Sequence, residues 1–232
     1  IRRSNLFLDD DIKYNNKVLF VAGEDDNIID ERYIKSGLYF KRELLENKHN
    51  VLPISFAVPR EKILENINEK PINLLAPLVP GRLSTYIYND EKTYYDMYSN
   101  SIFAITNKKL GWDCLRHYEI LMNGCIPLFL DIKNCPKNTI STLPKDRLIN
   151  FLNDFNYIFS FYNPFKIFKK KHLSFQRILT LLKFNFKSSN PGKFIKKNDS
   201  IFELKKDLLN FTKKNLTTEI LAKNTLNCFK EL

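Results

Sequence analysis

Residues 102–131 read IFAITNKKLGWDCLRHYEILMNGCIPLFLD. The apolar runs at the two ends, residues 102–106 and 125–132, have the length and composition of buried strands. Between them, a polar loop with one glycine leads into residues 113–123, whose apolar positions recur at helical spacing. Strand, helix and strand in this order predict two parallel strands joined by a right-handed crossover.

The same alternation extends outward in both directions. Strands are predicted at residues 17–22, 51–58 and 72–79, and helices at residues 34–45, 90–100, 143–154, 165–186 and 201–232. Alternating strands and helices indicate βαβ units, so the expected fold class is α/β with a mainly parallel, Rossmann-like sheet and a helical C-terminal tail.

Composition excludes several classes of protein. The chain has 232 residues, of which 44% are hydrophobic, which is too many for a disordered chain. No apolar run approaches the roughly 20 residues that span a bilayer. The four cysteines form no C-x-x-C pair and have no histidine at metal-ligand spacing, so we expect reduced thiols and no bound metal.

Charge is concentrated in the C-terminal half. The net charge is +11, and residues 1–110 contain equal numbers of basic and acidic side chains, so residues 111–232 carry the whole excess. The richest tract is residues 166–197. Such a surface attracts anions, which leaves nucleic-acid binding open as an alternative function beside an ordinary solvated basic face.

The loop at residues 107–112 has the features of an anion site. It follows a strand at the carboxyl end, where open α/β sheets bind ligands, and it precedes a helix N-terminus. Lys108 and Lys109 add positive charge, and Gly111 allows the backbone to approach a ligand closely. Asp113 is the expected N-cap of the helix, and Gly124 is expected to end it with a positive φ.

Within this helix, Asp113, Arg116 and Glu119 are spaced three apart and share a face. The opposite, buried face is expected to contain Cys114, Leu115, Tyr118, Leu121 and Met122. An arginine fork suits a phosphate, and a carboxylate accepts hydrogen bonds from both hydroxyls of a ribose. An exposed salt-bridge ladder is the alternative interpretation of the same spacing.

Together, these residues resemble the nucleotide-sugar half of exostosin-like glycosyltransferases. The similarity covers a serine before a strand (Ser99 or Ser101), Gly111, an Arg-x-x-Glu helix at residues 116–119, Gly-Cys-Ile-Pro at residues 124–127, and Asp131. The resemblance implies the GT-B architecture, in which two Rossmann-like domains face each other across a cleft. It also implies sugar transfer from a nucleotide-sugar donor, with inversion and without a metal or another cofactor.

The resemblance further implies a domain plan. Residues 1–59 would end the acceptor-side domain, residues 60–71 would form a linker, residues 72–160 would bind the donor, and residues 161–232 would form a basic helical extension. About 60 residues are too few for a complete Rossmann-like unit. The first domain is therefore expected to be incomplete, in keeping with a chain that does not begin with Met.

The expected donor-binding residues are Arg82, Lys108, Lys109, Gly111, Trp112, Asp113, Arg116 and Glu119. Trp112 would either line the pocket or pack in the core, and His117 is interpreted as structural. The general base is expected to come from the first domain, where Glu24 and Asp25 follow the strand at residues 17–22.

The expected partners are a nucleotide-sugar and a glycan or lipid-linked acceptor. The basic C-terminal helices would either cross back to the first domain, as the resemblance to the GT-B architecture implies, or contact an anionic membrane surface, and nucleic acid is not the expected partner. The enzyme would be cytoplasmic or membrane-peripheral, or would work in the Golgi lumen if an anchor precedes the chain. A domain that binds without catalysis and a different Rossmann-type enzyme are also compatible with this sequence, although no G-x-G-x-x-G follows a strand.

Overall fold

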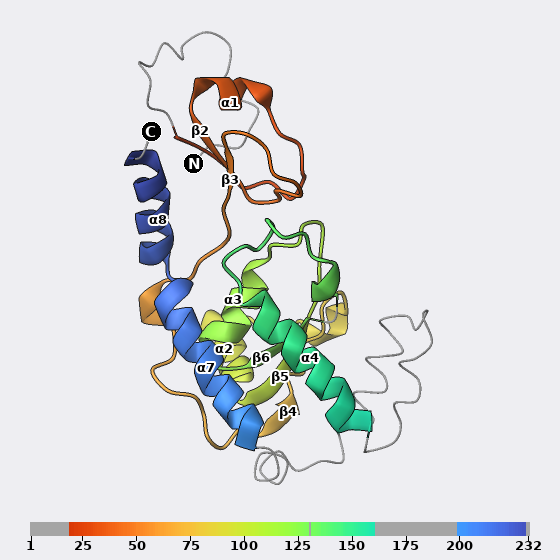
Figure 1. Ribbon diagram of the computed structural model, residues 1–232. Helices are drawn as coiled ribbons and strands as arrows, with labels where there is room; N and C mark the ends of the chain where they lie inside the picture. The colour runs from red at the N-terminus through yellow and green to blue at the C-terminus, as the bar shows by residue number, and fades with distance from the viewer. Residues whose placement is uncertain (1–18, 130, 161–198, 231–232) are drawn as a thin grey trace.

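The computed structural model describes residues 19–129, 131–160 and 199–230, and these form an α/β protein. Two three-stranded parallel sheets and a set of C-terminal helices make up the architecture, in a Rossmann-like arrangement (Figure 1). The predicted fold class is confirmed at this level.

The first sheet has the strand order β1-β2-β3. Its strands are β1 (Leu19–Ala22), β2 (Leu38–Lys41) and β3 (Val51–Pro53), and all neighbours are parallel. Helix α1 (Glu31–Ser36) connects β1 to β2 and is capped by the Asp30 side chain, which accepts a hydrogen bond from the backbone N–H of Arg32.

The prediction of one helix over residues 34–45 was wrong, because β2 lies inside that range. Apolar residues at 34, 38 and 45 fit a helix, but the run Leu38-Tyr39-Phe40 also has the composition of a short buried strand. All four residues of β2 are buried between β1 and β3. A short apolar run in the middle of a sheet has no periodicity that separates it from a buried helix.

The second sheet has the strand order β4-β5-β6 and is also parallel. Its strands are β4 (Asn73–Leu75), β5 (Ser101–Thr106) and β6 (Ile126–Phe129). Helix α2 (Glu91–Ser99) connects β4 to β5, and α3 (Leu115–Met122) connects β5 to β6. The two parallel strands joined by a helix that were predicted for residues 102–131 are therefore confirmed.

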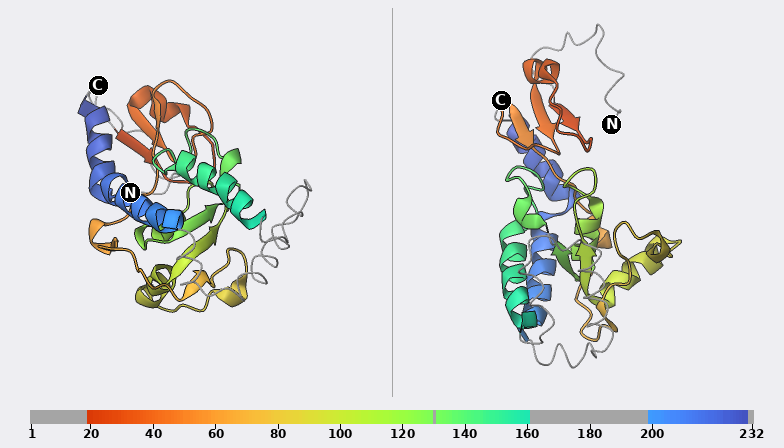
Figure 2. Two further views of the ribbon diagram at one scale, coloured as in Figure 1. Left: turned by 60° about the horizontal axis from the view of Figure 1, so that its bottom comes forward. Right: turned by 90° about the vertical axis from the view of Figure 1, so that its right-hand side faces the viewer.

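Helices cover both faces of this sheet (Figure 2). On one face, Phe103 and Ile105 share an apolar cluster with residues of α4 (Lys145–Ser160) and α7 (Asp199–Asn215). On the other face, Ala104 packs with Met97 and Tyr98 of α2. From Phe103 to Ile105, residues of β5 thus alternate between opposite layers, as expected for a central strand.

The C-terminal residues form two helices rather than the one predicted. Helix α7 ends at Asn215, residues 216–217 are not helical, and α8 (Thr218–Lys230) follows. At the break, the backbone N–H of Val58 donates to the Leu216 carbonyl over 2.9 Å, and the N–H of Thr218 donates to the Val58 carbonyl over 3.0 Å. This pairing joins the segment between the two sheets to the last helices.

Helix α7 belongs to the helical layer that covers one face of the second sheet. Ile201 and Leu208, both nearly inaccessible, belong to the apolar cluster beneath the second sheet. The helix predicted at residues 165–186 and the basic tract at residues 166–197 lie outside the described residues.

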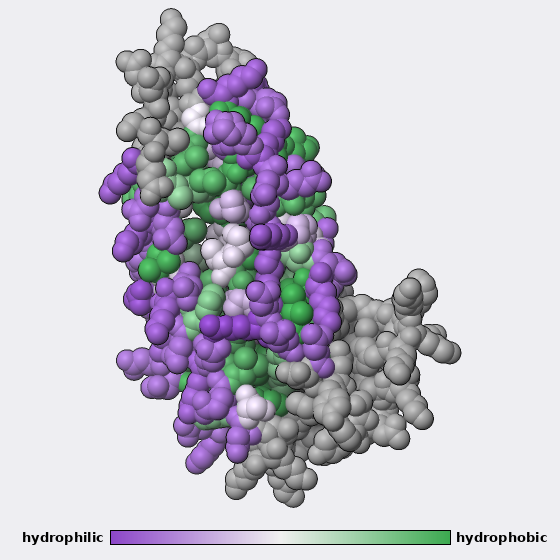
Figure 3. All heavy atoms as spheres, in the orientation of Figure 1, coloured by the Kyte–Doolittle hydropathy of each residue, from purple (hydrophilic) through white to green (hydrophobic). Residues whose placement is uncertain are grey.

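The surface seen in Figure 3 is mostly hydrophilic, with apolar side chains showing in patches. Across the part of the chain that the structure describes, no helix has the length and hydrophobicity needed to cross a membrane.

Candidate functional site

The loop at residues 107–114 contacts the carboxyl end of the first sheet, because Arg42 and Glu43 directly after β2 bond to Asp113. This loop follows β5, as predicted, and leads into α3. The N-cap of α3 is Cys114, not Asp113. The prediction failed because the Asp113 side chain has other partners, described below.

Arg116 is buried, with only 6% of its surface exposed. Its Nη2 donates to the phenol oxygen of Tyr86 over 3.3 Å, while its Nη1 is buried and has no hydrogen-bond partner among the described residues. The expected burial pattern of the helix was wrong here, since Leu115, expected inside, is 42% exposed. A buried guanidinium with a free donor is ready to bind an anionic or carbonyl oxygen.

Glu119 lies one turn further along α3, close to Arg116. Its Oε2 accepts a hydrogen bond of 2.8 Å from the hydroxyl of Tyr94, which lies 3.2 Å from the hydroxyl of Tyr98. Burial raises the pKa of Glu119, and the Tyr94 hydrogen bond and the positive charge of Arg116 oppose that rise. Arg116 and Glu119 thus lie one turn apart on α3, next to the segment after β4 and to α2 respectively, and no ion pair joins them within the described residues.

Asp113 is turned toward the first sheet. Its Oδ1 accepts from the hydroxyl of Tyr118 and its Oδ2 from the backbone N–H of Phe56, both over 2.8 Å. Only 3% of Asp113 is exposed. Burial raises its pKa to about 6, against the lowering effect of the Tyr118 hydrogen bond. Both carboxylate oxygens are occupied, so Asp113 links the segment after β3 to helix α3.

Arg42, at the end of β2, forms the other half of this link. Its Nη1 donates to the Asp113 carbonyl over 2.5 Å, its Nε donates to the Gly23 carbonyl over 2.9 Å, and its Nη2 pairs with Asp25. The neighbouring Glu43 accepts from the backbone N–H of Asp113 over 2.8 Å. Sequence reasoning missed Arg42 and Glu43 because it placed them inside a helix. Had β2 been recognised, two charged residues directly after a strand would have predicted that Arg42 and Glu43 lie at the carboxyl edge of the sheet.

The backbone at Gly111 approaches other protein atoms closely, and a side chain there would collide with them. A Cβ at this position would lie 2.6 Å from Glu43 Oε1 and 3.1 Å from Asp25 Oδ1. The sequence predicted that a ligand would make the close contact. In the structure, the carboxylate of Glu43 fills that space.

Glu24 and Asp25 follow β1 and lie at the same edge. Asp25 is engaged in the ion pair with Arg42. Glu24 is partly buried, and no hydrogen bond or ion pair of its side chain is found within the described residues. Next to them, Asp26 pairs with the buried Lys41 over 3.1 Å. Of the two expected base candidates, Glu24 is thus the one whose carboxylate is not already held by a cation.

The remaining expected donor residues do not join Arg116. Lys108 places its Nζ 5.2 Å from the centre of the Trp112 ring, and Trp112 is 8% exposed and packs against Phe129. Lys109 and Arg82 are exposed, with Arg82 at the start of the short 3-10 helix η2 (Leu83–Thr85). In the described part of the chain, no hydrogen bond or ion pair connects these cations to Arg116 or Glu119.

His117 is structural, as interpreted from the sequence. Its Nδ1 lies 2.8 Å from Thr106 Oγ1, and its Nε2 lies 2.9 Å from the Trp112 carbonyl oxygen. A carbonyl only accepts, so Nε2 carries the proton and Nδ1 accepts from the threonine hydroxyl. Burial lowers the pKa of His117 to about 4.

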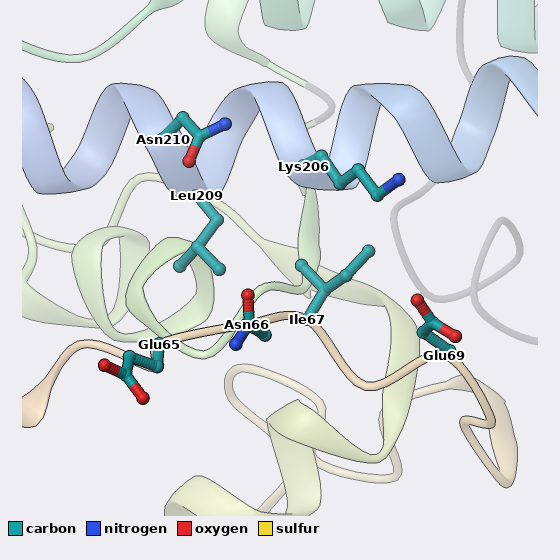
Figure 4. A pocket seen from close by; sticks show the side chains of 7 residues that line it. All are labelled: Glu65, Asn66, Ile67, Glu69, Lys206, Leu209 and Asn210. Carbon is teal, nitrogen blue, oxygen red and sulfur yellow. The ribbon is translucent and has the colours of Figure 1, made fainter.

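A surface pocket lies away from this edge. It has a volume of about 220 Å³ and is lined by Glu65, Asn66, Ile67, Glu69, Lys206, Leu209 and Asn210 (Figure 4). None of the expected donor residues lines it. Within residues 19–129, 131–160 and 199–230, no three His, Cys, Asp or Glu side chains gather closely enough to hold a metal ion.

Comparison with known proteins adds no relative. No family model matches the chain, and no similar curated protein or solved structure was found. The case for a function therefore rests on the residues themselves.

Proposed function

We propose that this chain contains the nucleotide-sugar-binding half of a glycosyltransferase of the GT-B type, joined to part of an acceptor-side domain. The observation that carries the proposal is the buried Arg116 with its unpartnered Nη1, beside Glu119. Both residues lie on the helix that begins at the carboxyl end of the central strand β5, where parallel sheets bind nucleotides. The contact between the β5–α3 loop and the carboxyl end of the first sheet also fits the GT-B plan.

Each member of the pair has a distinct task in this proposal. Arg116 contacts the diphosphate of the donor and neutralises the charge that grows on it as the sugar leaves. Glu119 accepts hydrogen bonds from the ribose hydroxyls in exchange for the one from Tyr94. Lys108, Lys109 and Arg82 supply a positive field around the site rather than direct contacts.

The transfer itself needs a base on the opposite side. The acceptor hydroxyl, on a glycan or a lipid-linked sugar, attacks the anomeric carbon and gives its proton to a carboxylate. The bond between that carbon and the diphosphate oxygen breaks, and the nucleoside diphosphate leaves with the electron pair. Glu24 is the better candidate for the base, because Asp25 is held by Arg42.

Calorimetric titration with nucleoside diphosphates and nucleotide-sugars tests the proposal. We expect Arg116→Ala to weaken binding of a diphosphate at least about 30-fold, which corresponds to roughly 2 kcal/mol for a lost charge-assisted contact. Glu119→Gln should weaken nucleotides and nucleotide-sugars alike but leave inorganic pyrophosphate unaffected, because Glu119 acts on the ribose.

Arg147→Ala is the matched control. Arg147 is an exposed arginine paired with Asp207 on α7, and its removal should leave nucleotide affinity unchanged. Circular dichroism confirms that each variant is folded. If the folded Arg116→Ala variant binds nucleotides as the wild type does, the proposed donor site is wrong.

A further inference from the structure

The segment from Gly81 to Tyr88, which follows β4, covers the Arg116 side chain. The phenol oxygen of Tyr86 lies 3.3 Å from Nη2 of Arg116 and 3.4 Å from the backbone nitrogen of Gly81. Two N–H donors from different parts of the chain thus converge on one oxygen. Both distances exceed those of strong hydrogen bonds, so the phenol oxygen is held loosely.

This arrangement leaves the guanidinium only partly used. A neutral phenol accepts one hydrogen bond from Arg116, and Nη1 remains buried without a partner among the described residues. A phosphate group offers several acceptor oxygens and a negative charge, so it would engage both Nη1 and Nη2 and the Gly81 N–H together. The number of donors therefore suits an anion better than a phenol.

The backbone of this segment is anchored, and its exposed side chains are free to move. The Thr85 hydroxyl accepts from the Val79 N–H over 3.0 Å and lies 2.7 Å from the Arg82 carbonyl, which anchors the backbone of the turn to Val79, a fully buried core residue. Gly81 has a φ of +79° and open space around it, whereas Leu83 is 87% exposed. Tyr88 packs against Tyr94, whereas Tyr86 is 43% exposed, so the Tyr86 side chain can turn into solvent without moving the rest of the segment.

We infer that the Tyr86 hydroxyl occupies the position of a diphosphate oxygen, and that the Tyr86 side chain is a lid which the diphosphate must displace from Arg116 while the Gly81 N–H stays in place. The inference rests on the proposed function for the nucleotide, but the anion subsite is defined by Arg116 and the Gly81 N–H alone. Tyr86 is then a built-in competitor for the donor's diphosphate, and it sets the affinity of the site.

The test is a set of calorimetric titrations of the full chain with UDP, ADP, GDP and inorganic pyrophosphate. Tyr86→Phe removes only the competing oxygen, so we expect about three- to tenfold tighter binding of pyrophosphate and of the nucleotide that binds. Tyr88→Phe removes a hydroxyl from the same turn without touching Arg116, and it should leave the affinity unchanged.

A double variant shows whether the effect acts through Arg116. In an Arg116→Ala background, the gain from Tyr86→Phe should disappear, because no guanidinium is left to release. Equal or weaker binding by Tyr86→Phe overturns the inference, and so does a gain that persists without Arg116.

The outcomes separate the two proposals. If the wild type binds a nucleoside diphosphate through Arg116 and Tyr86→Phe changes nothing, the lid is wrong and the donor site remains. If pyrophosphate binding shows the expected gain while no nucleotide binds better than pyrophosphate, the anion subsite and its lid remain and the nucleotide assignment is wrong. If neither wild type nor Tyr86→Phe binds any of the four probes, both proposals are wrong.

Discussion

At the scale of single residues, burial rather than charge sets the behaviour of the ionisable groups around α3. Asp113 and His117 are both almost inaccessible, and burial shifts the pKa of each in the direction that favours its uncharged form. The pKa of Asp113 rises to about 6, and that of His117 falls to about 4. The two groups therefore affect stability with opposite signs as the pH changes.

His117 gives a testable pH dependence. Its pKa in the folded state lies below the ordinary value of 6.5, so the unfolded chain takes up a proton first as the pH falls. The neutral imidazole contributes stability that is fully present above pH 6.5 and is lost as the pH falls toward 4, roughly 3 kcal/mol in all. The destabilisation caused by His117→Asn, measured by urea unfolding, should shrink by that amount between pH 7 and pH 4.

Comparing the variant with the wild type removes the opposite contribution of Asp113, which is present in both proteins. That contribution favours the fold below the ordinary carboxyl pKa of 3.8 and is lost as the pH rises through about 6. Nitrogen NMR of the ring gives an independent reading, in which His117 stays neutral with the proton on Nε2 at pH 5. A His117 ring that titrates near pH 6.5 would contradict the buried neutral state.

At the scale of elements, the contact between the first sheet and the β5–α3 loop depends on the absence of one side chain. Glu43 is buried and accepts from the Asp113 N–H, so it cannot retreat freely from an added methyl group at Gly111. Gly111→Ala should therefore reduce the free energy of unfolding by about 1–3 kcal/mol, as overpacking does elsewhere.

Gly23→Ala is the matched control, since a Cβ there would meet no atom within 4 Å. Gly23 lies in the loop after β1, and its carbonyl accepts from Arg42 in both proteins. Urea unfolding should show a change below about 0.5 kcal/mol for this variant. Equal effects of the two substitutions would mean that the contact between Gly111 and Glu43 does not constrain the loop.

At the scale of the whole molecule, α7 completes a core whose other members, such as Leu74 and Phe103, lie far earlier in the chain. Leu208 of α7 is 1% exposed in the cluster beneath the second sheet, whereas Leu226 of α8 is 54% exposed. Leu208→Ala should cost about 2–5 kcal/mol of unfolding free energy, and Leu226→Ala should cost less than about 0.5 kcal/mol. Similar costs in a denaturant titration would show that α7 is not integral to the domain.

The local pattern of residues 102–131 was sufficient to predict the parallel α/β fold, the crossover and the loop at the carboxyl end of β5. It was sufficient because apolar periodicity and turn residues act over a few positions. The same reasoning lost β2, since a four-residue buried strand has no period of its own. Because β2 was missed, so were Arg42 and Glu43, which join the first sheet to Asp113.

The sequence by itself determined the strand–helix–strand unit of residues 102–131 and the edge of the sheet at which the loop with Lys108 and Lys109 lies. Only the tertiary structure decided the partners of the charged residues in this unit: Asp113 is linked to Arg42, Lys108 lies over Trp112, and Arg116 lies beneath Tyr86. The reason is physical. Spacing along a helix fixes the direction of a side chain, but its partner depends on which distant segment packs over that direction. For Arg116, that segment is a turn 30 residues away in the chain.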